Sequence, residues 1–448
     1  MDRKAGKTKP TFYTAEKVAN ARRNIGRYGW ARAIRDKAVE AAAPFMELSD
    51  DDLWHLPTSQ SVPRSLGVLI RYRQRLKGSP GPEGAEINKY GNYPWIVDPI
   101  RYPWKLKSPV TGELYPSNDF KRYYESGLNE HGEFDPELAK KRGAQYLKNE
   151  LYPERGETWG VDDGWGWKDE DGDVWTFIAY YNHWALWATG GGQASHGLIT
   201  RGLNALRDAY LYTGDLRYAH KGLILLDRVA DLYPDMDITA HHWYLGFDNG
   251  DPSGHSAQGN ILHDIWETGL VKAFTFAYDA FFPAIGQDPE LIRFLSDKEK
   301  QYKLKYPKRS AEDIKRNIED RILRLIYPGV KNSRIRGNIG MHQSALALAA
   351  VVLDEEGTSK EWLDFVFKPG KLIKQPDPDA PFGRRYMVTG GNFDPLFYND
   401  IDRDGWGDEA SPGYNTGWLS NFLVVAQVVD GYERYPEYDL YRNPKFLK

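Results

Sequence analysis

The chain has no cysteine among its 448 residues, which excludes disulfides, thiol nucleophiles and cysteine-ligated metals. It also lacks an apolar run long enough to span a membrane, so no membrane partner is expected. Charge of neither sign prevails, because the net charge is only −4, and no general basic field points to nucleic acid. An anionic ligand would therefore need local clusters of Arg, Lys or His.

Two common catalytic signatures are missing as well. The zinc motif HExxH does not occur, and the glycines at 190–192 are not followed by the lysine of a phosphate-binding loop. Residues 1–17 have no apolar stretch typical of a signal peptide, and residues 1–10 are expected to be disordered. The protein is therefore expected to be cytoplasmic, unless a leader has been removed from it.

Aromatic residues are abundant, at 14% of the chain, with 15 Trp and 29 Tyr. Some of them must belong to the core. The excess also suits a groove that stacks sugar rings, because a flat aromatic face offers apolar contact beside polar edges. The composition thus points to a carbohydrate ligand.

The sequence divides into two parts by composition. Residues 14–47 have a helical pattern, and residues 48–145 are crowded with Pro, Gly, Tyr and Trp, which predicts irregular or short-stranded structure. We interpret 1–145 as a helical and irregular cap segment. Residues 146–448 then form the main domain, a series of helical hairpins such as the one joined at Thr213-Gly214-Asp215, where Gly214 is placed to end a helix. A mainly α fold is predicted, an incomplete α/α toroid or solenoid of antiparallel hairpins.

A first candidate site is Gly337-Asn338-Ile339-Gly340-Met341-His342-Gln343, ahead of a small, apolar run. Asn338 and His342 are four residues apart, so in a helix they share one face at its amino end. Such an end favours anions through free N–H groups and the helix dipole. An amide and an imidazole there could hold a carboxylate and move a proton. An Asn cap beside a hydrogen-bonded structural His explains the spacing equally well.

A second candidate is the acidic stretch that ends in Ser411-Pro412-Gly413-Tyr414-Asn415. Asp400, Asp402 and Asp404 alternate ahead of a glycine, as in a calcium loop, but the distal Glu of an EF-hand is replaced by Ser411. Either a structural Ca²⁺ or a solvated acidic turn fits this pattern. Tyr414 is expected at an exposed turn before the next helix.

Further polar and aromatic residues are candidates for binding substrate. Adjacent histidines, a compact basic pair and aromatic rings on a helix suit carboxylate, sulfate or sugar groups, although each also fits a structural role. These candidates are Trp184, His241, His242, Trp243, Gln343, Arg384, Arg385 and Glu409.

The chain resembles the heparinase II/III-like polysaccharide lyases through most of its length. The segments that carry the resemblance are LSDDDLWHLPTSQSVPRS (48–65), PWIVDPIRYPWKLKSPVTGELYPSNDF (94–120), NIGMHQ (338–343) and DRDGWGDEASPGYN (402–415). The resemblance implies an α/α toroid, catalytic Asn, His and Tyr groups at the last two segments, and export of the protein if a leader was removed. The β-sheet domain that follows the toroid in such lyases is absent from this chain or supplied elsewhere, as a possible partner.

The implied chemistry is β-elimination on an acidic, uronate-containing polysaccharide. Asn338, assisted by Gln343, would neutralise the uronate carboxylate as the C5 proton leaves. His342 would abstract that proton and Tyr414 would protonate the leaving oxygen, or Tyr414 would do both. No cofactor is required. Glycosaminoglycan is the first substrate expected, and alginate the second.

Two other functions remain open from the sequence. A glycoside hydrolase on a similar toroid would need two opposed carboxylates, and Asp162, Asp163, Glu267 and Glu409 are available. A non-catalytic sugar-binding module would explain the Trp and Tyr excess alone. Unsaturated products, which absorb in the near ultraviolet, would distinguish a lyase from both.

Overall fold

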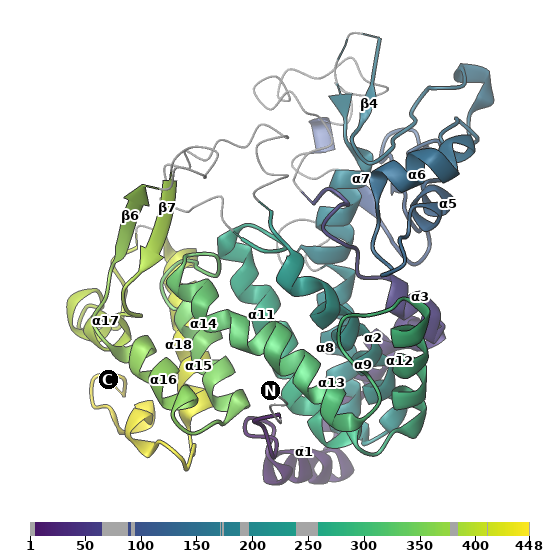
Figure 1. The fold of residues 1–448 in the computed structure, drawn as a ribbon. Helices are drawn as coiled ribbons and strands as arrows, with labels where there is room; N and C mark the ends of the chain where they lie inside the picture. Colours follow the sequence, from purple (N-terminus) through teal and green to yellow (C-terminus); the bar gives the residue numbers. More distant parts are fainter. Residues whose placement is uncertain are drawn as a thin grey trace.

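Helices dominate the protein and tend to follow one another in pairs. A computed structural model describes residues 5–64, 88–90, 95–170, 172, 174–188, 197–238, 259–376, 384–409 and 411–447. Within these ranges most elements are helices and the few sheets are very small, which confirms the mainly α prediction (Figure 1). The described helices include none that is long and apolar enough to cross a bilayer.

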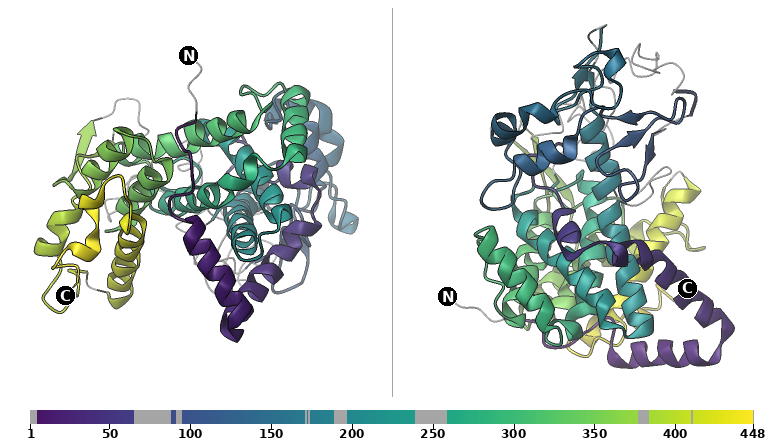
Figure 2. Two further views of the ribbon diagram at one scale, coloured as in Figure 1. Left: turned by 90° about the horizontal axis from the view of Figure 1, so that it is seen from below. Right: turned by 90° about the vertical axis from the view of Figure 1, so that its right-hand side faces the viewer.

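The longer helices form a row of packed neighbours. Their bounds are α1 Ala15–Arg27, α2 Gly29–Glu47, α3 Asp50–His55, α8 Leu198–Thr213, α9 Leu216–Leu232, α11 Asp264–Ile285, α12 Pro289–Gln301, α13 Ala311–Ile318, α14 Arg324–Lys331, α15 Met341–Leu353, α16 Thr358–Phe367, α17 Phe393–Asn399 and α18 Pro412–Val429. Helix α8 packs against α2, α9 and α11, and α15 packs against α11, α16 and α18. Figure 2 shows the first pair of helices beside the middle of this row and α18 at one end of it.

The hairpin predicted at residues 213–215 is present, and local chemistry explains it. Helix α8 ends at Gly214, whose φ of +79° is the left-handed conformation that glycine adopts without strain. The N–H of Gly214 donates to the carbonyl of Tyr210. Asp215 then caps α9, because its side chain accepts from the N–H of Arg217.

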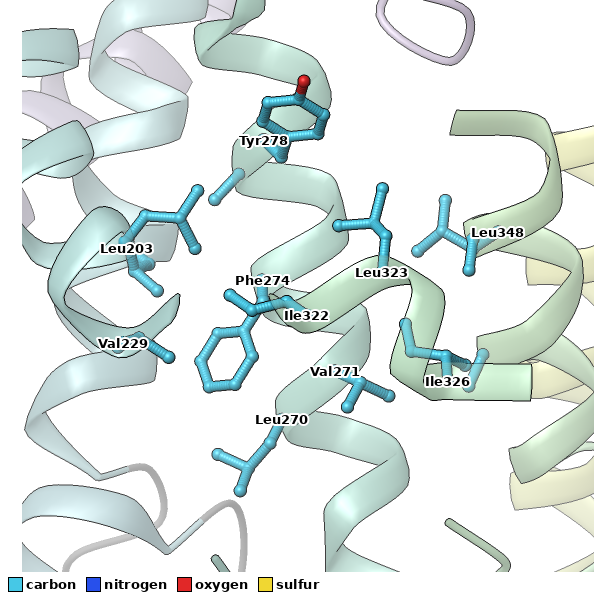
Figure 3. Close-up of a cluster of buried hydrophobic side chains, with 14 of the residues drawn as sticks. Leu203, Val229, Leu270, Val271, Phe274, Tyr278, Ile322, Leu323, Ile326 and Leu348 are labelled. Carbon is cyan, nitrogen blue, oxygen red and sulfur yellow. The ribbon is translucent and has the colours of Figure 1, made fainter. Parts of the chain in front are cut away.

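The core lies around α11, near the middle of the row. Figure 3 shows apolar side chains from α8, α9, α14 and α15 meeting those of α11, together with side chains of the short π-helix Glu319–Leu323. All of the labelled side chains are fully buried: Leu203, Val229, Leu270, Val271, Phe274, Tyr278, Ile322, Leu323, Ile326 and Leu348. Burying this apolar surface stabilises the row and fixes the relative positions of its helices.

The segment between α3 and α8 is irregular and aromatic, as the sequence predicts for most of it. Its elements are η2 Asn88–Tyr90, β1 Ile96–Val97, β2 Leu106–Lys107, β3 Leu114–Tyr115, α5 Phe120–Ser126, α6 Pro136–Gly143, η3 Ala144–Tyr146, η4 Pro153–Arg155, β4 Trp167–Lys168, β5 Val174–Trp175, α7 Phe177–Tyr180 and the π-helix η5 Tyr181–Trp187. Strands β1, β2 and β3 form one antiparallel sheet, with Ile96 opposite Lys107 and Leu106 opposite Tyr115. Many aromatic rings here pack on one another, for example Trp95 against Tyr115 and Phe177.

Near the carboxyl end, β6 (Leu372–Pro376) and β7 (Arg384–Val388) form an antiparallel hairpin that projects from the helices (Figure 1). Three 3-10 turns complete the described elements: η6 Tyr233–Asp235, η9 Pro436–Tyr438 and η10 Leu440–Arg442. The hairpin is small, and Leu372 pairs with Val388 at its base.

Residues 5–10 of the amino-terminal arm are held against the helices, for example by N–H groups of Gly6 and Lys7 that donate to Glu319, so the expected disorder of residues 1–10 is wrong for residues 5–10. Lys7 is buried, and its ammonium lies 2.6 Å from a carboxylate oxygen of Asp279 on α11. The same carboxylate accepts the N–H groups of Thr11, Phe12 and Tyr13. A charged side chain in the middle of α11 therefore holds the arm, which sequence composition alone did not reveal.

The first three helices belong to the row as well. Helices α1 and α2 pack against α8, and α3 packs against α9. Gly202 of α8 lies so close to α2 that a Cβ there would be 2.7 Å from the ring of Phe45. The amino-terminal helices thus share the core of the helices that follow residue 197, whereas the predicted boundary near residue 145 assigned them to the cap.

Candidate active site

The amino end of α15 lies between α11 and α18. The segment that leads to it passes the start of α11, where the N–H of Arg336 donates to the carbonyl of Asp264 at 3.2 Å. Gly340 precedes the helix with a φ of +87°. A Cβ at Gly340 would lie 2.7 Å from the Cβ of Asn421 on α18, so only glycine fits this contact. No side chain caps this end of the helix.

Asn338 and His342 flank this end rather than sharing a helical face. Helix α15 begins at Met341, so Asn338 lies in the preceding turn, where its carbonyl accepts from the N–H of Met341 at 3.0 Å. The prediction of a shared helical face is therefore wrong, because Gly340 interrupts the helix between the two residues. Asn338 is partly exposed, whereas His342 is buried, with 8% of its surface exposed.

The imidazole of His342 is held neutral. Burial and, to a smaller extent, the positive charge of Arg336 lower its pKa to about 3, although a hydrogen bond to the backbone of Gly337 acts in the opposite direction. Its Nδ1 has no hydrogen-bond partner among the described residues. A neutral ring with an unpaired nitrogen can accept a proton, but this nitrogen is buried and the lowered pKa makes the ring a weak base.

Gln343, the next residue on α15, is buried and points elsewhere. Its side-chain N–H donates to the carbonyl of Gly391 at 2.8 Å, beyond β7. Its Oε1 lacks a partner within the described part of the chain. The side-chain N–H of Gln343 therefore links α15 to the segment before α17. Only its Oε1 would be available to assist Asn338.

His342 should make the protein sensitive to acid. Because its folded pKa lies below the value near 6.5 of an unfolded chain, protons bind the unfolded state preferentially, and stability falls as the pH drops from about 6.5 toward 3. We expect His342→Gln, which has no titratable group, to lose less thermal stability than the wild type between pH 7 and pH 5. Melting temperatures at both pH values measure this, and equal losses would contradict the prediction.

Tyr414 lies in the first turn of α18, which begins at Pro412, and not in a turn ahead of the helix as predicted. The helix begins early because Pro412 fits its first position. The side chain is 54% exposed, and its hydroxyl has no hydrogen bond to any described residue. Tyr414 and Asn421 are seven residues apart, so they share a face of α18 at a separation of about 10 Å. Tyr414 is thus displaced by about two turns from the contact between Asn421 and Gly340.

Sequence reasoning missed a lysine at this place. Lys272 of α11 donates to Oδ1 of Asn421 on α18 at 2.7 Å and to Oγ of Ser344 on α15 at 3.2 Å. Burial lowers the pKa of Lys272 to about 8. The signal was available, because Lys272 is the one basic residue in the otherwise apolar and acidic stretch DIWETGLVKAFTFAYDAFF.

The remaining substrate-binding candidates lie in different environments. Trp184 is 5% exposed in the π-helix η5, where it packs against Tyr180 and His183, so its ring serves the core. Glu409 is partly exposed, and its carbonyl accepts from the side chain of Asn415 at 2.7 Å. Arg384 and Arg385 belong to β7, but their side chains lie outside the described structure, as do the whole of His241, His242 and Trp243.

The acidic stretch before α18 forms a tight loop. Ile401 pairs with Gly407, and the side chain of Asp404 accepts the N–H of Trp406 at 3.1 Å within the loop. Desolvation, helped by the charge of Asp408, raises the pKa of Asp400. No group of three His, Cys, Asp or Glu residues in the described ranges is placed to hold a metal ion, and the cation site at Asp400, Asp402 and Asp404 stays a prediction.

The buried carboxylates proposed for a hydrolase are bonded to their own backbone. Asp162 accepts the N–H groups of Gly164, Gly166 and Ile178, and burial raises its pKa to about 6. Glu267 accepts those of Ile261 and Leu262, and burial raises its pKa to about 7. Both side chains are fully buried, so each stabilises a loop instead of facing a ligand.

Comparison of the chain with protein-family models, with curated proteins and with solved structures found no match.

Proposed function

We propose that this protein is a polysaccharide lyase that cleaves an acidic, uronate-containing polymer by β-elimination. The observation that supports it most is the set of groups around the amino end of α15. The neutral imidazole of His342, with a buried and unpaired Nδ1, adjoins a helix end without a side-chain cap. The phenol of Tyr414, which has no hydrogen-bond partner in the described structure, lies on the neighbouring helix α18, about two turns from the contact between Asn421 and Gly340. Proton removal and proton donation need groups of these two kinds.

The elimination would proceed as follows. The C5–H bond of the uronate breaks, its proton passes to a base, and its electron pair forms the C4–C5 double bond. The C4–O bond breaks with its electron pair on oxygen, and this leaving oxygen takes a proton from an acid. His342 is the base in this scheme and Tyr414 is the acid. Asn338, which is partly exposed in the turn before α15, would stabilise the carboxylate as negative charge develops on it. If both proton transfers occur on one face of the sugar, Tyr414 would perform both.

The arrangement of the helices is compatible with the toroid that the family resemblance implies. Helices α2, α8, α11, α15 and α18 succeed one another as packed neighbours, and α9 and α16 pair with α8 and α15. We propose that this succession is an incomplete α/α toroid and that the substrate lies across it near the start of α15. Candidate contacts at its edges are Glu409 and the β6–β7 hairpin that carries Arg384 and Arg385.

A panel of acidic polysaccharides tests the proposal. Hyaluronan, chondroitin sulfate, heparan sulfate, alginate and polygalacturonate would be incubated with the protein, and near-ultraviolet absorbance and new reducing ends would be followed together. We expect both signals to rise with at least one polymer, glycosaminoglycans first, and neither with dextran, a neutral control. Reducing ends without absorbance would indicate a hydrolase instead. The absence of both signals across the panel would favour a binding module.

A further inference from the structure

Three enclosed lysines of the described structure have carboxylate partners, and Lys272 does not. Lys7 faces Asp279, Lys298 faces Asp51, and Lys308 faces Asp227 and Asp231. The ammonium of Lys272 instead contacts only a neutral amide and a neutral hydroxyl, and none of the described carboxylates forms an ion pair with it.

An enclosed cation without a counterion is electrostatically incomplete. Transfer of an ammonium from water into the protein costs several kcal/mol unless an opposite charge compensates for it. Neutral oxygens recover only part of this cost. A lysine ammonium has three N–H donors, and Asn421 and Ser344 use two of them. The third donor has no acceptor among the described residues, and the side chain is partly exposed, so a ligand can supply one.

The surroundings of Lys272 also favour negative charge. Ser344 is the fourth residue of α15, so the ammonium of Lys272 lies beside the first turn of that helix. The N–H groups and the dipole of a helix attract anions at this end. Asn421 keeps its oxygen toward the lysine, because its side-chain N–H donates to the carbonyl of Gly417. The hydroxyl of Ser344 can donate to the carbonyl of Met341, which leaves its oxygen to accept from the lysine. Ser344 and Asn421 therefore hold the ammonium of Lys272 at the start of α15 and leave one of its N–H donors available to a ligand.

We propose that Lys272, positioned by Ser344 and Asn421, binds an anionic group of the ligand at the amino end of α15. This identification rests on the proposed function: the ligand is a uronate, and the anionic group is its carboxylate. A sulfate group of a sulfated sugar is also an anion that would accept from the ammonium, and the experiment below distinguishes it from a carboxylate. Lys272 would thereby select acidic sugars, and Asn338 would act on the same carboxylate during elimination.

Binding of monosaccharides tests the proposal without requiring turnover. Calorimetric titration at pH 7 would compare D-glucuronate, glucose 6-sulfate and glucose on the wild type and on Lys272→Met, which keeps an unbranched apolar stem and removes the ammonium. We expect the wild type to bind glucuronate and not glucose, and the variant to bind glucuronate about 10- to 100-fold more weakly, as for loss of a hydrogen bond to a charged group. Tight binding of glucose 6-sulfate alone would overturn the carboxylate assignment.

Lys105→Met is the matched control. Lys105 is also enclosed, its pKa is also lowered by burial to about 8, and its ammonium also contacts neutral oxygens, the carbonyls of Pro116 and Asn118. It lies between β1 and β2, away from α15. This variant should lose stability yet bind glucuronate as the wild type does. If Lys272→Met binds glucuronate normally and only melts at lower temperature, Lys272 is a structural link and the proposal is wrong.

The same data keep the two proposals apart. Glucuronate binding that depends on Lys272, without unsaturated products from any polymer, would support the anion site and contradict the lyase. Unsaturated products formed equally well by wild type and Lys272→Met would support the lyase and contradict the anion site. If Lys272→Met does not fold, Lys272→Gln, which can still bond to Ser344 and Asn421, replaces it and should show the same loss of affinity.

Discussion

Replacement of Tyr414 by Phe is expected to lower the rate of unsaturated-product formation by about 10²–10⁴-fold, the usual contribution of general acid–base catalysis. Tyr414 is 54% exposed, and its hydroxyl bonds to none of the described residues. Phe keeps the ring and removes only the hydroxyl, so the melting temperature should not change. Rates and melting temperatures would be measured on one sample of the variant, and substrate affinity should remain close to that of the wild type.

Tyr398→Phe is the control for Tyr414→Phe. Tyr398 is 68% exposed on α17, and its hydroxyl likewise bonds to no described residue, so its loss should alter neither rate nor stability. The size of the loss distinguishes the two elimination schemes, because the rate should fall further if Tyr414 is both base and acid than if it is the acid alone. A stable Tyr414→Phe protein with a near-normal rate would remove Tyr414 from the mechanism.

Replacement of Lys308 by Met is expected to destabilise the protein by about 3–5 kcal/mol, the usual cost of removing one partner of a buried ion pair. The ammonium of Lys308 is fully buried and lies 2.7 Å from both carboxylate oxygens of Asp227 and 2.8 Å from Asp231. Asn317 completes the cluster by donating to Asp227 at 2.9 Å. Met would keep most of the packing but leave the buried carboxylate of Asp227 without its lysine partner and Asp231 with only Arg228, at 4.0 Å. Urea unfolding of both proteins measures the loss.

The loss should depend on pH. Burial raises the pKa of Asp227 to about 6 even with Lys308 present, and removal of the lysine raises it further. A folded pKa above the unfolded value means that protonation favours the folded state, so this stability is lost as the pH rises. The deficit of Lys308→Met should therefore be smaller at pH 5 than at pH 8. Lys140→Met, which breaks an exposed pair with Glu137, should change stability at neither pH.

Local features of the fold could be predicted from the sequence because their causes are local. Gly214 and Asp215 end one helix and begin the next through contacts within a few residues. The apolar periodicity of α8 and α9 predicts which sides are buried. The irregular character of most of the segment between α3 and α8 follows from its Pro and Gly content.

The site was predicted only in part because its properties depend on neighbours. The sequence made Asn338, His342 and Tyr414 candidates and predicted that Tyr414 is exposed, but it did not predict that His342 is enclosed. Exposure depends on which helices cover a residue, and this is absent from the local pattern. The prediction that Asn338 and His342 share a helical face was wrong for a local reason. Gly340 adopts a left-handed conformation, so the helix begins only at Met341.

The sequence by itself determined the helical class and the hairpin at Gly214, because propensity and capping act over a few residues. It also supplied the candidate residues for the proposed proton transfers through their side-chain chemistry. Only the tertiary structure decided that Lys272 has no carboxylate partner in the described chain. Its acceptors, Ser344 and Asn421, lie 72 and 149 residues away and reach it because α11, α15 and α18 pack together. Packing of distant helices also enclosed Lys308 with Asp227 and the amino-terminal arm with Asp279, since burial is a property of the whole fold.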